Sequence, residues 1–191
     1  MKATIILSSI LVGVSVFFNS RSENNTIKVA SYKVSKARKT TSLPVAPVRI
    51  IIDKSDYELY VYDALGWYAT YPVVFGSSSL DDKKYEGDKK TPEGSFRIIS
   101  KKPHNKWSRF MLIDYPNKET LARFNERKRR GEIPKSAKPG GGVGIHGTWP
   151  HDEYIVDRYK NWTLGCISLK NEDVQELYSY IPTGTPVTIK R

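Results

Sequence analysis

The sequence predicts a mainly β domain with a few packed helices, over residues 47–190 of the 191-residue chain. Three observations lead to this fold class. Apolar and polar residues alternate along several short stretches, turns containing Gly, Pro or Asp separate these stretches, and only two segments have helical spacing. A domain of this length can bury about two-thirds of the surface of its unfolded chain, which is enough for one core.

The first expected strands follow one another closely. Residues 48–53, VRIIID, form a short β-branched run, and residues 57–63, YELYVYD, place Leu59 and Val61 on one side of a strand. The turn DALG leads into a returning strand at 67–76, which predicts an antiparallel meander. A polar loop is expected next, at 77–90. Three further segments that contain strands are expected at 91–100, 109–114 and 184–191.

Two helices are expected in the second half of the chain. Asn117 can cap a helix over 118–130, because an Asn side chain accepts from the free N–H groups at a helix start. Asn171 can cap a second helix over 172–181, in which apolar residues recur at helical spacing. Pro182 ends this second helix.

The N-terminus predicts export. Residues 1–20 combine one lysine with an uncharged, mostly apolar stretch, which is typical of a secretory signal peptide or an uncleaved N-terminal anchor. Residues 21–46 are rich in Ser, Thr, Asn and Lys without sustained periodicity, and we interpret them as a basic flexible linker. The protein is therefore expected in the periplasm or cell envelope, with membrane contact only through its N-terminal segment.

The net charge of +11 is concentrated in two stretches, residues 21–43 and 118–138, which contribute +5 each. Outside the cytosol such patches meet anionic wall polymers, lipid headgroups or carboxylate-rich substrates, and export removes nucleic acid from reach. A solvated linker and a solvated helix face explain the two stretches equally well. Anionic wall polymers thus remain open as partners, and the expected export argues against nucleic acid.

The chain has a single cysteine, Cys166, preceded by Gly165, and twenty residues upstream His146 precedes Gly147. A nucleophilic thiol needs a nearby base and backbone N–H groups for the oxyanion, and glycines let the backbone approach a substrate. Two neighbouring strands joined by a loop would bring His146 to Cys166. These residues favour a thiol nucleophile; an inert buried cysteine and a satisfied core histidine remain the alternatives.

Other site chemistries find less support. The segment FGSSSL lacks the Gly-x-Ser-x-Gly turn of a serine hydrolase. A zinc site would be mixed in ligand type and irregular in spacing compared with known zinc motifs. We therefore expect no metal. The residues weighed as zinc ligands are His146, His151, Asp152 and Cys166.

Three ordered segments resemble the YkuD-type L,D-transpeptidase catalytic domain. KKTPEGSF at 89–96 is similar to the family's Thr-Pro-x-Gly-x-Phe segment, and GIHGT at 144–148 is similar to its histidine segment. NWTLGCISLKNEDVQELYSYIPTGTPVTI at 161–189 is similar to its cysteine segment. The resemblance covers about residues 47–190, and the chain looks most like the periplasmic murein branch with a W-T-x-G-C-I motif.

The resemblance implies a β-sandwich-like fold and acyl transfer on peptidoglycan stem peptides, with no cofactor. Cys166 would attack the bond between a diamino acid at position three and D-Ala at position four, and an amine would resolve the thioester. His146 would move protons, the Gly147 carbonyl would orient its ring, and the N–H groups of Gly165 and Cys166 would bind the oxyanion. Further residues expected at the substrate are Trp149, Arg158, Trp162, Thr163 and Ser168.

Two positions depart from the family pattern. Leu164 replaces the histidine of Ser/Thr-His-Gly-Cys, and Ser168 replaces the arginine of Gly-Cys-x-Arg. Recognition of the substrate carboxylate would then pass to Arg158, Lys160 or Arg109. Two other functions stay open: a hydrolase on the same fold, which cleaves cross-links or releases wall-linked protein, and a non-catalytic wall-binding module.

Overall fold

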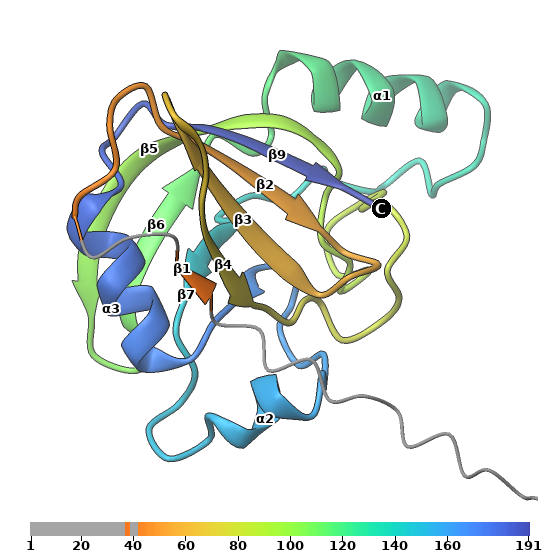
Figure 1. Ribbon diagram of the computed structural model, residues 1–191. Helices are drawn as coiled ribbons and strands as arrows, with labels where there is room; N and C mark the ends of the chain where they lie inside the picture. The colour runs from red at the N-terminus through yellow and green to blue at the C-terminus, as the bar shows by residue number, and fades with distance from the viewer. Residues whose placement is uncertain (1–36, 39–41) are drawn as a thin grey trace, which may run out of the picture. The chain divides into compact units, whose positions relative to one another are not determined.

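The computed structural model describes residues 37–38 and 42–191 (Figure 1). The expected signal peptide or anchor at 1–20 and most of the expected linker at 21–46 lie outside these residues. No helix in the described ranges is long and apolar enough to cross a membrane. The described chain is mainly β with three helices, which confirms the predicted fold class.

The strands of the described chain are hydrogen-bonded in the order β1-β4-β3-β2-β9-β5-β6-β7-β8. Strands β2, β3 and β4 form the predicted antiparallel meander, and β9 returns from the C-terminus to run parallel to β2. The bounds are β1 Ala37–Arg38, β2 Arg49–Asp53, β3 Glu58–Asp63, β4 Gly66–Pro72, β5 Gly94–His104, β6 Ser108–Ile113, β7 Gly144–His146, β8 Ile167–Ser168 and β9 Pro186–Lys190.

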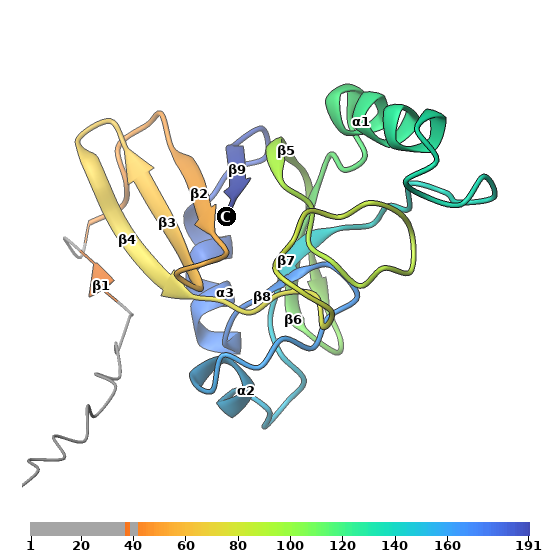
Figure 2. The same cartoon turned by 90° about the vertical axis from the view of Figure 1, so that its right-hand side faces the viewer.

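The long strand β5 joins two sheet layers. Its first residues, Gly94–Arg97, pair with β9, and the residues from Ile98 onward pair with β6. The register shifts between Ile98 and Ser100, where the strand passes from one layer to the other. Figure 2 shows β2, β3 and β4 on one side and β5, β6, β7 and β8 on the other. The arrangement is the expected β-sandwich-like fold.

Alternating side chains of both layers form the core. Leu59 and Val61 of β3 are fully buried, as their shared side of the strand predicted. Burial of an aliphatic side chain stabilises the fold by about 1.5–3 kcal/mol. Partners from the other strands include Ile50, Ile52, Phe96, Ile98, Met111, Ile113, Ile145, Ile167, Val187 and Ile189.

Helix α1, Lys118–Arg129, begins as predicted. The Asn117 side chain accepts from Thr120 N at 3.1 Å, and Asn117 N donates to Thr120 Oγ1 at 2.9 Å. Helix α3, Asn171–Tyr180, begins one residue earlier than predicted, with Lys170 at the cap. The predicted cap at Asn171 is therefore wrong, because this residue is already helical and its Nδ2 donates to Glu153 Oε1 at 2.9 Å.

Helix α3 connects the two layers. Its Val174 and Leu177 are fully buried in the core, and the helix packs on β6 and β7. At its end, Tyr180 Oη lies 2.7 Å from Tyr71 Oη of β4, and the Tyr180 ring meets Tyr68 edge-on. The short helix α2, Tyr154–Asp157, lies in the connection from β7 to β8, for which the sequence predicted only a loop.

Candidate active site

The parallel pair β7–β8 brings the histidine and cysteine segments together. Ile145 is the register partner of Ile167, and His146 is the partner of Ser168. Cys166 immediately precedes β8, two residues before Ser168, so its side chain leaves the strand on the same side. His146 and Cys166 consequently line one pocket.

A segment after β4 holds both ends of the turn that carries Cys166. Val74 and Ser168 exchange two backbone hydrogen bonds of 2.9 Å. At the other end, Phe75 O accepts from Trp162 N and Thr163 N, both at 3.1 Å. The turn is therefore held on each side of the thiol by backbone hydrogen bonds.

Thr163 closes this turn from inside. Its Oγ1 donates to Cys166 O at 2.8 Å and accepts from Gly165 N at 3.1 Å. Gly165 N–H, which the sequence analysis assigned to the oxyanion, is thus already engaged. Gly165 has φ +140°, and a Cβ there would lie 2.8 Å from Lys90 O, so the position requires glycine.

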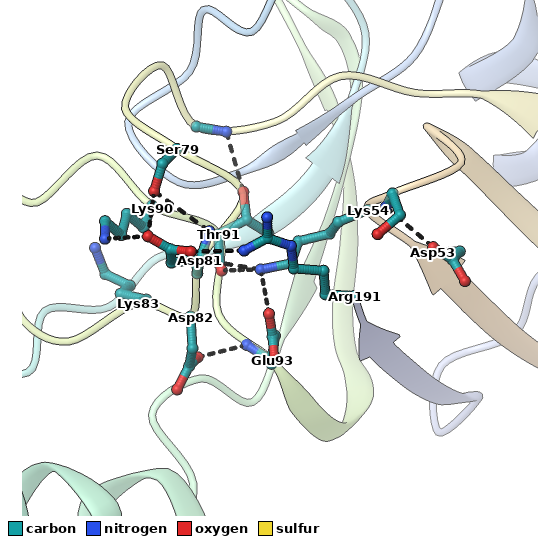
Figure 3. Close-up of polar contacts among 12 residues, drawn as sticks. Asp53, Lys54, Ser79, Asp81, Asp82, Lys83, Lys90, Thr91, Glu93 and Arg191 are labelled. Carbon is teal, nitrogen blue, oxygen red and sulfur yellow. Dashed lines mark hydrogen bonds and ion pairs between the residues drawn. The ribbon is translucent and has the colours of Figure 1, made fainter.

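The loop between β4 and β5 packs against this turn and is anchored by a buried lysine (Figure 3). Lys54, fully buried at the end of β2, lies 2.7 Å from Glu93 Oε1 and donates to Asp81 O and Thr91 O at 3.2 and 3.3 Å. Thr91 Oγ1 accepts from Gly76 N at 3.0 Å. The sequence offered no signal for Lys54, because its partners lie 27 or more residues away.

The imidazole of His146 is buried and held in one orientation. Its Nδ1 lies 2.6 Å from Gly147 O, and Ser168 Oγ donates to the same oxygen at 3.2 Å. Trp107 stacks on the ring with centroids 4.5 Å apart. An Nδ1–H donated to Gly147 O leaves Nε2 as the available base. Burial lowers the pKa of His146 to about 4, so the ring is neutral at pH 7.

The Cys166 thiol is half-buried, with Sγ 3.7 Å from Gly142 O. Burial raises the pKa of Cys166, while the Gly144 backbone N–H and the Lys83 ammonium act in the opposite direction. Thiol and imidazole are therefore both neutral at rest.

The pocket has a volume of about 660 Å³. Its aromatic wall includes Trp107 and Trp162, whose buried Nε1 atoms have no hydrogen-bond partner within the described ranges. Sequence reasoning missed Trp107, which no motif marks. Of the predicted site residues, those lining the pocket are His146, Trp162, Thr163, Gly165 and Cys166.

The other predicted residues lie outside the pocket lining. Trp149 is 38% exposed and meets Trp107 edge-on, and Arg158 lies over the Tyr154 ring. Ser168 is completely buried. Gly147 lies behind the His146 ring, and a Cβ there would meet Asn171 Oδ1 at 2.1 Å.

The cations of the pocket differ from those that the sequence suggested. Arg109 lies over the Tyr178 ring, and neither Arg158 nor Lys160 is part of the lining. The lysines that line the pocket are Lys83, Lys89 and Lys102, with Glu86 as the acidic residue. Within residues 37–38 and 42–191, no three His, Cys, Asp or Glu side chains gather in a way that would hold a metal ion.

The fold is that of an L,D-transpeptidase catalytic domain. The chain belongs to this family: the family model YkuD, described as the L,D-transpeptidase catalytic domain, matches residues 47–189. No curated protein matches the chain.

Solved structures share the fold. Bd1075 of Bdellovibrio bacteriovorus has a TM-score of 0.53 and 21% identity, covering 81% of this chain and 51% of its own. The helical cell shape determining protein Pgp2 of Campylobacter jejuni has a TM-score of 0.53 and 22% identity, covering 82% of this chain and 50% of its own. An L,D-transpeptidase of Enterococcus faecium has a TM-score of 0.51 and 19% identity, covering 76% of this chain and 50% of its own. The chain thus spans about half the length of these structures.

Proposed function

We propose that this protein is a cysteine-dependent acyltransferase that acts on peptidoglycan stem peptides in the cell envelope. The observation that carries the proposal is the pairing of β7 with β8, which puts His146 and Cys166 on one pocket. The orientation of the His146 ring adds support, because Nδ1 is hydrogen-bonded to Gly147 O and Nε2 is left to act as the base. Membership of the L,D-transpeptidase family supplies the substrate class.

The first half-reaction forms a thioester. His146 Nε2 takes the thiol proton while Cys166 Sγ attacks the carbonyl carbon of the third stem residue, forming a C–S bond and an oxyanion. Cys166 N–H has no other acceptor in the described chain, so we assign it to the oxyanion. When the intermediate collapses, the C–N bond breaks and the D-Ala amine leaves with the proton from His146.

The second half-reaction regenerates the thiol. An acceptor amine, from a second stem or a free D-amino acid, loses a proton to His146 Nε2 and attacks the thioester. A C–N bond forms, the C–S bond breaks, and the sulfur recovers its proton. Water in place of the amine would yield a free carboxylate, so the same site also supports the hydrolase alternative.

The predicted residues divide by place. Trp162 and Thr163 line the pocket, where the indole offers stem contacts and the Thr163 hydroxyl holds the Cys166 turn. Ser168 acts through the Gly147 carbonyl. Trp149 and Arg158 would meet a substrate only beyond the pocket rim. Pgp2 is a helical cell shape determining protein, and we propose that this chain also acts in determining cell shape.

The test is exchange of D-Ala on a tetrapeptide muropeptide for a labelled D-amino acid, with intact-mass detection of acylated Cys166. We expect the acyl adduct and the exchanged product from the wild-type protein and neither from a Cys166→Ala variant. Equal exchange by that variant would refute the proposal. A free carboxylate without any amine adduct would favour the hydrolase, and sacculus binding without acylation would favour the wall-binding module.

A further inference from the structure

A buried ion pair lies beside the pocket in the loop between β4 and β5. Lys83 Nζ and Asp88 Oδ1 are 2.8 Å apart, and each side chain is 5% exposed. Lys83 belongs to the pocket lining, whereas Asp88 does not. The ammonium is thus the charged group that the pair presents to the pocket.

The two partners are satisfied to different degrees. Asp88 also accepts from the backbone N–H groups of Lys84, Tyr85 and Lys90, at 2.6, 3.2 and 3.0 Å. The Lys83 ammonium has three N–H donors, and among the described residues Asp88 Oδ1 is its only acceptor. Two donors of a buried cation are thus left for a ligand, and a buried cation without acceptors is costly.

The ammonium is close to the reacting position. A Cβ built on Gly165, the residue before Cys166, would lie 3.8 Å from Lys83 Nζ. The carboxylate of a single leaving residue is joined to the attacked carbonyl carbon through one nitrogen and one α-carbon, so it lies within about 4 Å of that carbon. Lys83 and Cys166 also line the same pocket, and the Lys83 charge acts on the thiol, so the ammonium lies on the side of the pocket that a carboxylate so close to the attacked carbonyl can reach.

The lysine is also held in place before a substrate arrives. Arg127 donates to Lys83 O at 2.9 Å and pairs with the neighbouring Asp82 at 2.7 Å. Asp82 accepts in turn from Glu93 N at 2.8 Å, next to the Lys54 anchor (Figure 3). Ordering before binding lowers the entropic cost of recognition.

We propose that Lys83 binds the α-carboxylate of the single amino acid that leaves after attack by Cys166. The inference rests on the proposed function. Lys89 and Lys102 also line the pocket but are exposed, where water screens them. A site of this kind selects stem peptides that end in a free acid one residue past the scissile bond.

Binding to a Cys166→Ala protein tests the proposal without turnover. The probes are a stem tetrapeptide with a free C-terminal acid and the same peptide with a C-terminal amide, titrated by calorimetry. We expect the acid to bind about 10- to 100-fold more tightly, the range of a charge-assisted hydrogen bond. Lys83→Met should abolish this preference, and the matched control Lys102→Met should keep it.

A second variant guards against misfolding. Lys83→Met leaves Asp88 without its cation, whereas Lys83→Met/Asp88→Asn removes both charges and should also lose the preference while melting as a folded protein. An unchanged acid preference in either folded variant would overturn the inference.

The two proposals fail separately. Turnover by the wild-type protein without acid-over-amide discrimination overturns the role of Lys83 and leaves the acyltransferase intact. Discrimination that depends on Lys83, without acylation of Cys166, supports the carboxylate site and overturns the acyltransferase. No binding of either peptide overturns both.

Discussion

His146 and Ser168 share one hydrogen-bond acceptor, the carbonyl oxygen of Gly147, at 2.6 Å from His146 Nδ1 and 3.2 Å from Ser168 Oγ. The two residues are also register partners across β7 and β8. The orientation of the imidazole is therefore tied to the strand that directly follows Cys166.

Ser168→Ala should lower kcat for D-amino acid exchange about three- to tenfold with KM unchanged, because one hydrogen bond that steadies Gly147 O is lost. Steady-state kinetics check this, and Ser179→Ala, which removes a hydroxyl from the exposed face of α3, is the control. A rise in KM at constant kcat would instead place Ser168 at the substrate, as the sequence analysis expected.

Gly147→Ala should destabilise the protein by about 1–3 kcal/mol, because a Cβ would lie 2.1 Å from Asn171 Oδ1 and 2.9 Å from Trp107 O. Urea denaturation measures the change. Combining it with Asn171→Ala should recover part of the loss. Gly141→Ala, where a Cβ finds only ordinary contacts, should stay within about 0.5 kcal/mol of wild type. Equal stabilities of the two single variants would contradict the packing argument.

The pKa of His146 predicts a loss of stability in mild acid. Its folded value of about 4 lies below the ordinary 6.5, so the unfolded state binds more protons between these values and stability falls as pH drops through 6.5. Between pH 7 and pH 5 the loss should be about 2 kcal/mol. In His146→Phe, which preserves ring stacking, denaturation curves should lose this contribution. The same pH dependence in both proteins would contradict burial of a neutral imidazole.

Lys54→Met should destabilise the protein by about 2–3 kcal/mol, less than the 3–5 typical of a fully buried broken pair because Glu93 is partly exposed. Lys54 anchors the loop that packs on Gly165, so the rate at which iodoacetamide alkylates Cys166 should also differ from that of the wild-type protein. Lys190→Met, which removes an exposed partner of Asp53, is the control and should cost less than about 1 kcal/mol and leave alkylation unchanged. Similar melting of both variants would mean that the anchor contributes nothing.

The arginines at the C-terminal end of the basic helix α1 differ in the contacts they make. Arg127 holds Asp82 and Lys83 O, so Arg127→Glu should lower the melting temperature. Arg129 and Arg130 are exposed, and within the described part of the chain they pair with acids of their own segment, Glu126 and Glu132. If α1 docks on anionic wall polymer, reversing these two charges should weaken sacculus binding in a salt-sensitive way without changing melting. Unchanged binding would return α1 to a solvated surface.

Local patterning was sufficient for most of the fold. The alternation in residues 57–63 predicted β3, because it places Leu59 and Val61 on the same, apolar side of the strand. The Asn117 cap was predicted because it involves a residue only three positions away. The cap of α3 was missed because the Asn171 side chain bonds Glu153, 18 residues upstream. Helix α2 was missed because four residues carry no helical period.

The candidate site divides in the same way. Motif and chemistry were enough to nominate Cys166 and His146, because a lone thiol after a glycine and a histidine before a glycine are visible along the chain. Pairings between distant segments are not visible there: Lys54 with Glu93, or Lys83 beside Gly165, arise only when the sheets close around the loop. Burial then sets the charges of the thiol and imidazole, since desolvation depends on every neighbour and not on adjacent residues alone.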